Sequence, residues 1–132
     1  MSQEAVTVAA RLFVEWEREG FGVVRDLMDP EVEYVNPPYA VEPGTRRGYD
    51  GFALAAGSIH AVYPDRRLVP LEFHDAGDRV AVRARVIACG TASGLEVDTE
   101  RGYVLTVRDG KVVRFAWFNE PHEALAAVGL GA

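Results

Sequence analysis

A handful of side chains combine a reactive group with a place in an expected helix or strand. His60 stands late on an expected helix, beside its apolar face, and an imidazole titrates near neutral pH, as acid–base catalysis requires. A histidine at a helix edge with no chemical task is the structural alternative. Glu100 is the best-placed carboxylate in the expected sheet, where it can pair with an arginine or act in catalysis. Tyr34, Asn36 and Tyr103 offer hydrogen bonds, but an amide cannot serve as a general base near neutrality.

The arginines of an expected central strand raise a question of orientation. Side chains alternate along a strand, so Arg83, Arg85 and Ile87 share one face, and the apolar positions 80, 82, 84, 86 and 88 share the other. In one interpretation the apolar face is the core and the arginines point to water, and the pattern alone favours it. In the other the apolar face is a dimer surface and the arginines face a pocket, where a buried guanidinium must meet a carboxylate or an acidic ligand.

The elements that would position these groups follow from the periodicity of apolar residues. The i, i+3, i+4, i+7 spacing from Ala9 to Trp16 predicts an amphipathic helix, and a later helix capped by Asp50 is expected at about 51–63. The period then changes from 3.6 to 2, which is typical of strands. The expected strands are 32–36, 67–74, 79–89, 95–108 and 111–119, with hairpin turns at 75–78, 92–94 and 109–110, a loop at 39–48, a short helix at 23–28 and a last helix from Pro121 to Gly129.

Helices gathered on one side of an antiparallel sheet indicate the α+β class, and a chain of 132 residues is expected to be one domain, 1–132. A formal net charge of -6 disfavours nucleic acid and anionic membranes as partners. The sequence has no apolar run long enough to span a membrane and no basic leader before an apolar stretch. The lone Cys89 and the scattered histidines give no disulfide and no metal motif. We therefore expect a cytoplasmic protein without a metal or cofactor.

The order of elements, together with three segments, resembles the nuclear transport factor 2-like superfamily. The segments are YPDRRL, FHDAGDRVAVRARV and VRDGKVVRFAWFNEPHEALAAVGL, and they are similar to SnoaL-like polyketide cyclases and ketosteroid isomerase-like proteins. The resemblance covers nearly the whole chain. It implies a strongly curved antiparallel sheet, helices over its concave face, a pocket between them and a homodimer through the outer face. Such proteins include isomerases, cyclases, epoxide hydrolases, dehydratases and non-catalytic members, so the fold does not name a reaction.

The resemblance also bears on individual positions. By similarity to limonene epoxide hydrolases, Arg83, Arg85 and Ile87 line the cavity, and the segment 34–36 helps to hold the attacking water. The Asp-Arg-Asp triad of those hydrolases is broken, because Arg83 matches its arginine but Arg85 and Ala116 replace the two acids. Epoxide hydrolysis by that triad is therefore not expected.

Comparison with ketosteroid isomerase-like enzymes leads to a similar result. Asn36 falls roughly where those enzymes carry a general-base aspartate, so the usual isomerisation lacks its base. Tyr103 falls near their second acid, and its hydroxyl can still donate a hydrogen bond to an enolate. Packing of Tyr103 in the core is the alternative. Trp16 and Phe118 are expected either as apolar walls of the pocket or as core residues.

These observations predict a SnoaL-like protein that holds a small hydrophobic molecule, bearing a carbonyl or carboxylate, in a buried pocket. Cofactor-independent proton transfer of isomerase, cyclase or hydrolase type, simple binding, and action through a dimer face all stay open. The expected ligand-binding residues are Trp16, Tyr34, Asn36, His60, Arg83, Arg85, Ile87, Arg101, Tyr103 and Phe118. The catalytic candidates among them are Tyr34, Asn36, His60 and Tyr103. The expected dimer face holds Val82, Ala84, Val86, Phe115 and Trp117.

Overall fold

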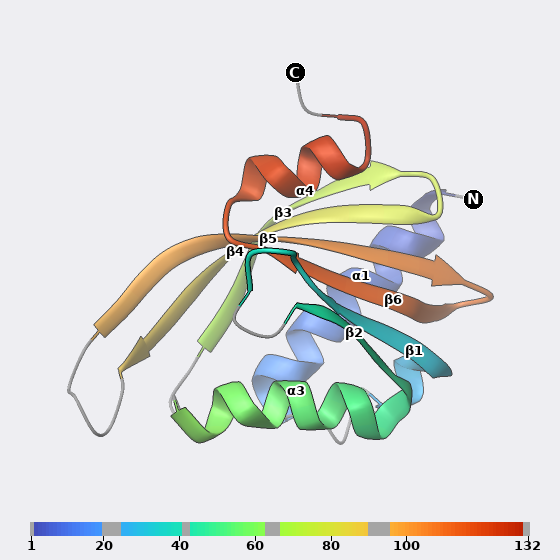
Figure 1. The fold of residues 1–132 in the computed structure, drawn as a ribbon. Helices are drawn as coiled ribbons and strands as arrows, with labels where there is room; N and C mark the ends of the chain where they lie inside the picture. Colours follow the sequence, from blue (N-terminus) through green and yellow to red (C-terminus); the bar gives the residue numbers. More distant parts are fainter. Residues whose placement is uncertain (1, 20–24, 41–42, 63–66, 90–95, 131–132) are drawn as a thin grey trace.

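Six strands of the chain form one sheet, which carries helices on both faces (Figure 1). The computed structural model describes residues 2–19, 25–40, 43–62, 67–89 and 96–130. The elements are α1 (Ser2–Glu19), a 3-10 turn η1 (Arg25–Leu27), β1 (Met28–Asn36), β2 (Gly44–Arg47), α3 (Gly48–Val62), β3 (Arg67–Ala76), β4 (Arg79–Cys89), β5 (Glu96–Arg108), β6 (Lys111–Phe118) and α4 (Pro121–Ala127).

The strand order is β2-β1-β6-β5-β4-β3, and the sheet is mixed. Strands β3, β4, β5 and β6 are successive antiparallel neighbours, but β1 runs parallel to β6. The expectation of a purely antiparallel sheet is therefore wrong at this one pair. No local turn sets the direction of β1 against β6, because α3 and four further strands separate them in the chain. The expected turn at 92–94 lies outside the described residues. The α+β class and the curved sheet are confirmed.

The main core lies between the sheet and the helices α1 and α3, on the side that we call the inner face. It contains Leu12 and Phe13 from α1, Phe52 from α3 and apolar residues of five strands. The strand residues are Met28, Val32, Tyr34, Leu68, Val80, Val82, Ala84, Val86, Tyr103, Leu105, Val107, Val112 and Phe115. The apolar alternation of β4 thus faces the helices, because α1 requires an apolar surface on which to bury its stripe.

Helix α4 lies on the opposite side of the sheet, the outer face (Figure 1), and a second, smaller core lies beneath it. Ala81 and Val104 of the sheet pack there against Ala124 and Val128. The helix approaches the backbone of β5 closely at Gly102, where an added Cβ would lie 2.8 Å from the Cβ of Ala124. Glycine at this position is thus required by the docking of α4.

Local differences from the expected elements have identifiable causes. Strand β1 begins at Met28 and passes through Pro30, which lies where its pairing with β6 shifts register between Met28 and Glu33. A proline has no backbone donor, so it fits best where the ladder is interrupted. Strand β2 was missed because its sequence, GTRR, is short and exposed. Helix α3 begins at Gly48, so Asp50 lies in its first turn and not at its cap.

Candidate functional site on the inner face

Six aromatic side chains pack together between α1, α3 and the sheet, and we call this group the aromatic floor. It consists of Phe13, Trp16, Tyr34, Phe52, Tyr103 and Phe115. The ring of Tyr34 is stacked on Phe115 with centroids 5.7 Å apart, and Phe13 meets Tyr103 edge-on at 5.5 Å. Tyr34 is 5% exposed and Tyr103 is 4% exposed. The floor is therefore a closely packed apolar layer of the main core, with two phenol rings built into it.

Next to the floor, strand register brings four half-buried polar residues together. Because Tyr34 pairs with Phe115, Asn36 and Trp117 lie side by side two residues further on, and Trp117 Nε1 donates to Asn36 Oδ1 at 2.6 Å. The pairing of Tyr103 with Trp117 likewise brings Arg101 beside Asn119. The Arg101 Nη1 donates to Asn119 Oδ1 at 2.8 Å. We call Asn36, Arg101, Trp117 and Asn119 the polar end of the inner face.

The polar end is held in place from the turn that follows β1. The hydroxyl of Tyr39 accepts a hydrogen bond from the backbone N–H of Asn119 at 2.8 Å and donates one to Glu123 Oε2, also at 2.8 Å. Partial burial raises the pKa of the Tyr39 phenol above its ordinary value, and the Glu123 carboxylate raises it further, against the opposing effect of the Asn119 N–H. The phenol therefore stays protonated and remains a donor. This contact fixes Asn119, and with it the amide oxygen that Arg101 contacts.

The arginines of β4 have a different environment. Arg83 contacts Glu72 at 2.6 Å and Glu100 at 2.7 Å, and Arg85 forms a two-pronged pair with Asp98 at 2.8 and 2.7 Å. These hydrogen bonds raise the pKa of both guanidinium groups. Hydrogen bonds from Arg83 and Arg85 hold the pKa values of Glu72 and Asp98 below their ordinary range. By contrast, no carboxylate is paired with Arg101 in the parts of the chain that the structure describes.

The structure corrects the predicted orientation of several site residues. Arg83 and Arg85 point to the outer face, where their charges are neutralised in contact with water, and Ile87 shares this strand face. Phe118 packs against the small core beneath α4 and not against the aromatic floor. Four residues were expected to line a pocket on the helix-covered inner face, but they lie on the opposite, outer face of the sheet. They are Arg83, Arg85, Ile87 and Phe118. Contact with a ligand on their own face stays a prediction.

The proposed composition of the dimer face is also wrong. Val82, Ala84, Val86 and Phe115 are core residues beneath α1 and α3, and Trp117 packs against the same core. Dimerisation through the outer face itself stays a prediction. The predicted pairing of Glu100 with an arginine is confirmed by its contact with Arg83.

Five predicted ligand-binding residues lie on the inner face, namely Trp16, Tyr34, Asn36, Arg101 and Tyr103. Tyr103 is packed in the main core and Trp16 packs against it, as the core-packing alternative predicts. Ligand contact by these residues stays a prediction. His60 lies in α3, but its side chain is outside the described residues. Asn119 and Tyr39 were missed. The sequence does indicate that Asn119 shares a strand face with Trp117. Its hydrogen bond with Arg101 could not be predicted, because it depends on the register of β5 against β6. Tyr39 gives no sequence signal, since its partners are 80 and 84 positions away.

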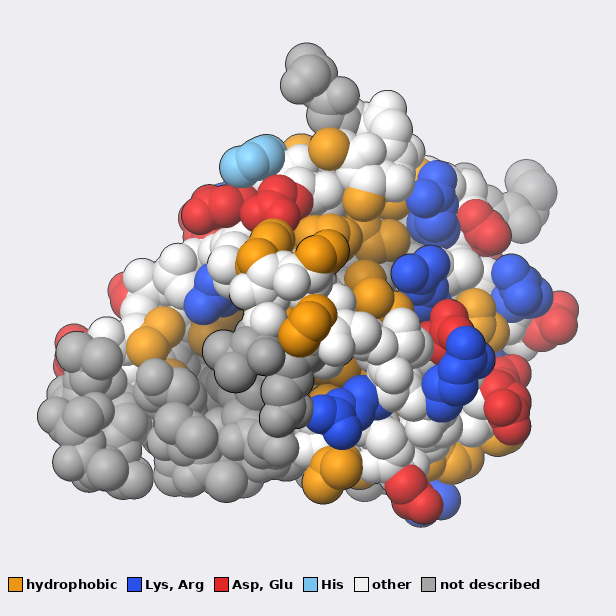
Figure 2. All heavy atoms as spheres, in the orientation of Figure 1, with side chains coloured by type: hydrophobic (Ala, Val, Ile, Leu, Met, Phe, Trp, Pro, Cys, Tyr) orange, Lys and Arg blue, Asp and Glu red, His pale blue; other side chains and the backbone are white. Residues whose placement is uncertain are grey.

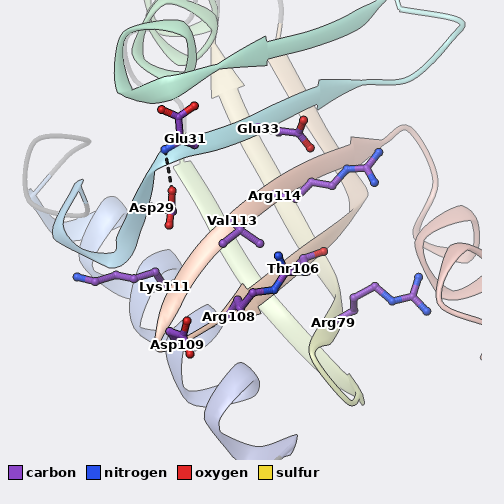
Figure 3. Close-up of a pocket in the computed structure, with 10 residues that line it drawn as sticks. All are labelled: Asp29, Glu31, Glu33, Arg79, Thr106, Arg108, Asp109, Lys111, Val113 and Arg114. Atoms are coloured by element: carbon purple, nitrogen blue, oxygen red, sulfur yellow. Dashed lines mark hydrogen bonds between the residues drawn. The ribbon is translucent and has the colours of Figure 1, made fainter.

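A second candidate surface lies on the outer face, at the end of the sheet not covered by α4 (Figure 3). It is an open groove with a volume of about 580 Å³. The lining residues are Asp29, Glu31, Glu33, Arg79, Thr106, Arg108, Asp109, Lys111, Val113 and Arg114.

Within the described ranges, no three His, Cys, Asp or Glu side chains are grouped as a metal site would need. None of the helices in those ranges is both long and apolar enough to cross a membrane.

Comparison with known proteins identifies a family for this chain. The family model described as "SnoaL-like domain" matches residues 9–115. A comparison with curated proteins found no match. Similar solved structures include a proposed SnoaL-like polyketide cyclase from Jannaschia sp. CCS1, with a TM-score of 0.80 and 21% identity over 99% of this chain and 95% of that one.

Two further structures are similar over almost their whole length. IdmH, a proposed polyketide cyclase from Streptomyces antibioticus, has a TM-score of 0.76 and 21% identity over 95% of this chain and 98% of that one. TerC, co-crystallised with polyporic acid, has a TM-score of 0.76 and 22% identity over 95% of this chain and 98% of that one. At these identities the similarity establishes the fold alone.

Proposed function

Because the chain belongs to the SnoaL-like domain family, we propose that it binds a small hydrophobic molecule whose carbonyl or carboxylate oxygen is held by Arg101. Proteins of this family bind small molecules, and the proposal assigns the site to the inner face. The observation that carries it is the state of Arg101: a half-buried guanidinium on the inner face, bonded to a neutral amide and two positions along β5 from Tyr103 of the aromatic floor.

The physical argument starts from the cost of leaving a charge partly desolvated. A guanidinium has five N–H donors, and the Asn119 oxygen accepts from one nitrogen of Arg101. An anionic oxygen of a ligand would use the remaining donors in a charge-assisted hydrogen bond, which is stronger than a neutral one. The aromatic floor would cover the apolar body of the same molecule. An apolar surface with a few converging polar groups is the usual composition of a small-molecule site.

The same arrangement limits the chemistry that accompanies binding. Arg101 and the Tyr103 hydroxyl are donors that can polarise a carbonyl and stabilise an enolate. A general base is also needed for proton transfer. Within the described residues, the inner-face positions of β1, β4, β5 and β6 carry no carboxylate. On β3, Asp75 stands opposite Val80, but it is exposed beside the turn and accepts a hydrogen bond from the Gly77 N–H. His60 therefore stays the candidate for that task, and the proposal itself concerns binding.

Titration calorimetry with matched ligands tests the proposal. Polyporic acid, which was crystallised with TerC, is one probe; 2-naphthoic acid and 2-naphthalenemethanol form a pair that differs in the carboxylate. We expect the acid to bind at least tenfold more tightly than the alcohol. Replacing Arg101 with Met should weaken the acid about 10- to 100-fold, equivalent to roughly 1.5–3 kcal/mol for a hydrogen bond to a charged group, and leave the alcohol unchanged.

The matched control is Arg85→Met, which removes an arginine of the neighbouring strand from the outer face. This variant should bind the acid as the parent protein does. Equal loss in both variants, or unchanged affinity for the acid in Arg101→Met, would show that Arg101 does not hold the ligand oxygen. Failure of all three compounds to bind the parent protein would count against the proposed ligand class.

A further inference from the structure

The groove on the outer face is built on one straight row of side chains that crosses the sheet. Arg79 of β4 pairs with Thr106 of β5, and Thr106 pairs with Arg114 of β6. Arg114 in turn pairs with Glu33 of β1. Residues directly opposite one another on neighbouring strands share a face, so all four side chains project into the same groove (Figure 3). Arg108 lies two positions after Thr106 on β5, so its side chain projects from the same face into the groove.

One side of the groove is basic. Neighbouring strands lie roughly 4.8 Å apart, so the backbones of Arg79 and Arg114 are about 10 Å apart, with the Thr106 hydroxyl between them. Arg79 donates one Nη1 bond to the carbonyl of Ala127 at 3.1 Å. In the part of the chain that the structure describes, Arg79, Arg108 and Arg114 form no ion pair with a carboxylate, whereas Arg83 and Arg85, further along β4, both do. Three guanidinium groups thus gather around a hydroxyl, and within the described residues neither of the nearby carboxylates, Asp109 and Glu33, forms an ion pair with them.

The other side of the groove is acidic. Asp29, Glu31 and Glu33 follow one another along β1, across β6 from Arg108 (Figure 3). Arg47 neutralises Glu33 at 3.0 Å, and Asp29 Oδ1 accepts the backbone N–H of Glu31 at 2.8 Å. Within the described residues, the Glu31 carboxylate forms no ion pair with a cationic side chain. Figure 2 shows acidic and basic side chains gathered over the side of the molecule where β1, β5 and β6 lie.

We propose that this groove binds a small zwitterion. Its phosphate or carboxylate would lie against Arg79, Thr106, Arg108 and Arg114, and its ammonium group against the carboxylates of β1. Three features support this choice over a simple anion or cation. The arginines stand on β4, β5 and β6 and three carboxylates stand on β1, with Asp109 and Lys111 at the turn end of the groove. The strands β5 and β1 are two strand spacings, about 10 Å, apart, and the volume of about 580 Å³ suits a small metabolite. Of the ten lining residues, Val113 alone is apolar, so the ligand is polar throughout.

The probe is 3-aminopropyl phosphate, compared with its two halves, propyl phosphate and propylamine, at low ionic strength. Amide chemical shifts in ¹⁵N spectra would locate the binding site and give the affinities. We expect the zwitterion to bind at least tenfold more tightly than either half, with the largest shifts at Thr106, Arg108 and Arg114. Added salt should weaken binding, because the groove is open to water.

Two variants separate the ends of the ligand. Arg114→Gln should weaken both the zwitterion and propyl phosphate. Glu31→Gln should weaken the zwitterion but not propyl phosphate, since it removes the carboxylate that meets the ammonium group. Arg83→Gln is the control, because it changes an arginine of the same face outside the groove and should leave the affinities unchanged.

The proposal is overturned if propyl phosphate binds as tightly as the zwitterion, which would indicate an anion site only. It is also overturned if ~10 mM zwitterion causes no shifts at these three amides, or if the shifts fall at Arg101 and Asn119 instead. None of these readouts depends on a ligand of the inner face, so the two proposals fail separately.

Discussion

The two faces of the sheet use arginine in different ways. On the outer face, Arg83 and Arg85 are matched by Glu72, Glu100 and Asp98 within 2.6–2.8 Å, and the groups remain in contact with water. On the inner face, Arg101 lies next to the aromatic floor and contacts an amide. A charge in water gains little from a partner, whereas a charge that is partly removed from water needs one. A ligand anion would therefore stabilise an arginine more on the inner face than on the outer face. The following substitutions test this difference between the two faces.

The largest expected effect is on the packing of the inner face. Phe115 is 2% exposed and contacts five rings of the aromatic floor. Phe115→Ala should lower the free energy of unfolding by about 3–5 kcal/mol, because it leaves a cavity among packed rings. Phe118→Ala, at the half-buried edge of the outer core, should cost less. Urea denaturation measures both, and equal losses would contradict the assignment of the main core to the inner face.

The next effect concerns the docking of α4 on the outer face. Gly102→Ala places a Cβ against Ala124 and 2.9 Å from the Glu120 carbonyl oxygen, so we expect a loss of about 1–3 kcal/mol. The double variant with Ala124→Gly should recover part of this loss, since it removes the Ala124 Cβ. Thermal unfolding of the two single variants and the double variant measures this coupling. Strict additivity would mean that α4 does not sit on Gly102.

A smaller effect is expected at the contact that links the two faces. Tyr39→Phe removes both hydrogen bonds of the phenol and should cost about 1 kcal/mol of stability. Because the pKa of Tyr39 is raised in the folded state, its contribution is fully present below the ordinary value of 10.0 and is lost as pH rises above it. The variant should therefore show a flatter loss of stability in alkaline urea titrations. An unchanged alkaline profile would show that the phenol titrates normally.

The smallest effect is expected for the exposed ion pairs. The pKa values of Asp98 and Glu72 are lowered on folding, so their contribution is present above the ordinary values of 3.8 and 4.5 and is lost as pH falls below them. Arg85→Met should reduce the difference in the free energy of unfolding between about pH 6 and about pH 3. The loss of stability at alkaline pH that depends on Tyr39 should be unchanged. High salt should mimic the variant. An acid profile identical to that of the parent protein would show that Asp98 gains nothing from Arg85.

Much of the architecture could be predicted from local patterns. Strand β4 has the predicted bounds, Arg79–Cys89, and β6 and α4 differ from prediction by one or two residues. The expected turn at 109–110 is present, with positive φ at Asp109 and Gly110. The expected SnoaL-like family is confirmed by the match over residues 9–115. These successes share a cause: helix and strand periods and turn residues act over a few neighbouring positions.

The candidate site could be predicted only in part. Tyr34, Asn36, Arg101 and Tyr103 share the inner face of the sheet, whereas Arg83, Arg85 and Phe118, which were expected on that face too, lie on the outer face. The residue pattern by itself favoured the arrangement that the structure has, and the resemblance to epoxide hydrolases favoured the other. Arg83 and Arg85 have carboxylates on the neighbouring strands β3 and β5, so they do not need a pocket.

By itself, the sequence determined which side chains share a strand face, because alternation with a period of 2 is a property of the backbone. It could not determine which face α1 and α3 would cover, since that depends on the packing of elements far apart in the chain. Register decided the rest. The pairing of β5 with β6 brings Arg101 to Asn119, the parallel pairing of β1 with β6 brings Asn36 to Trp117, and one row across four strands forms the groove. Register is a tertiary property, because a slip of one residue would reverse every face.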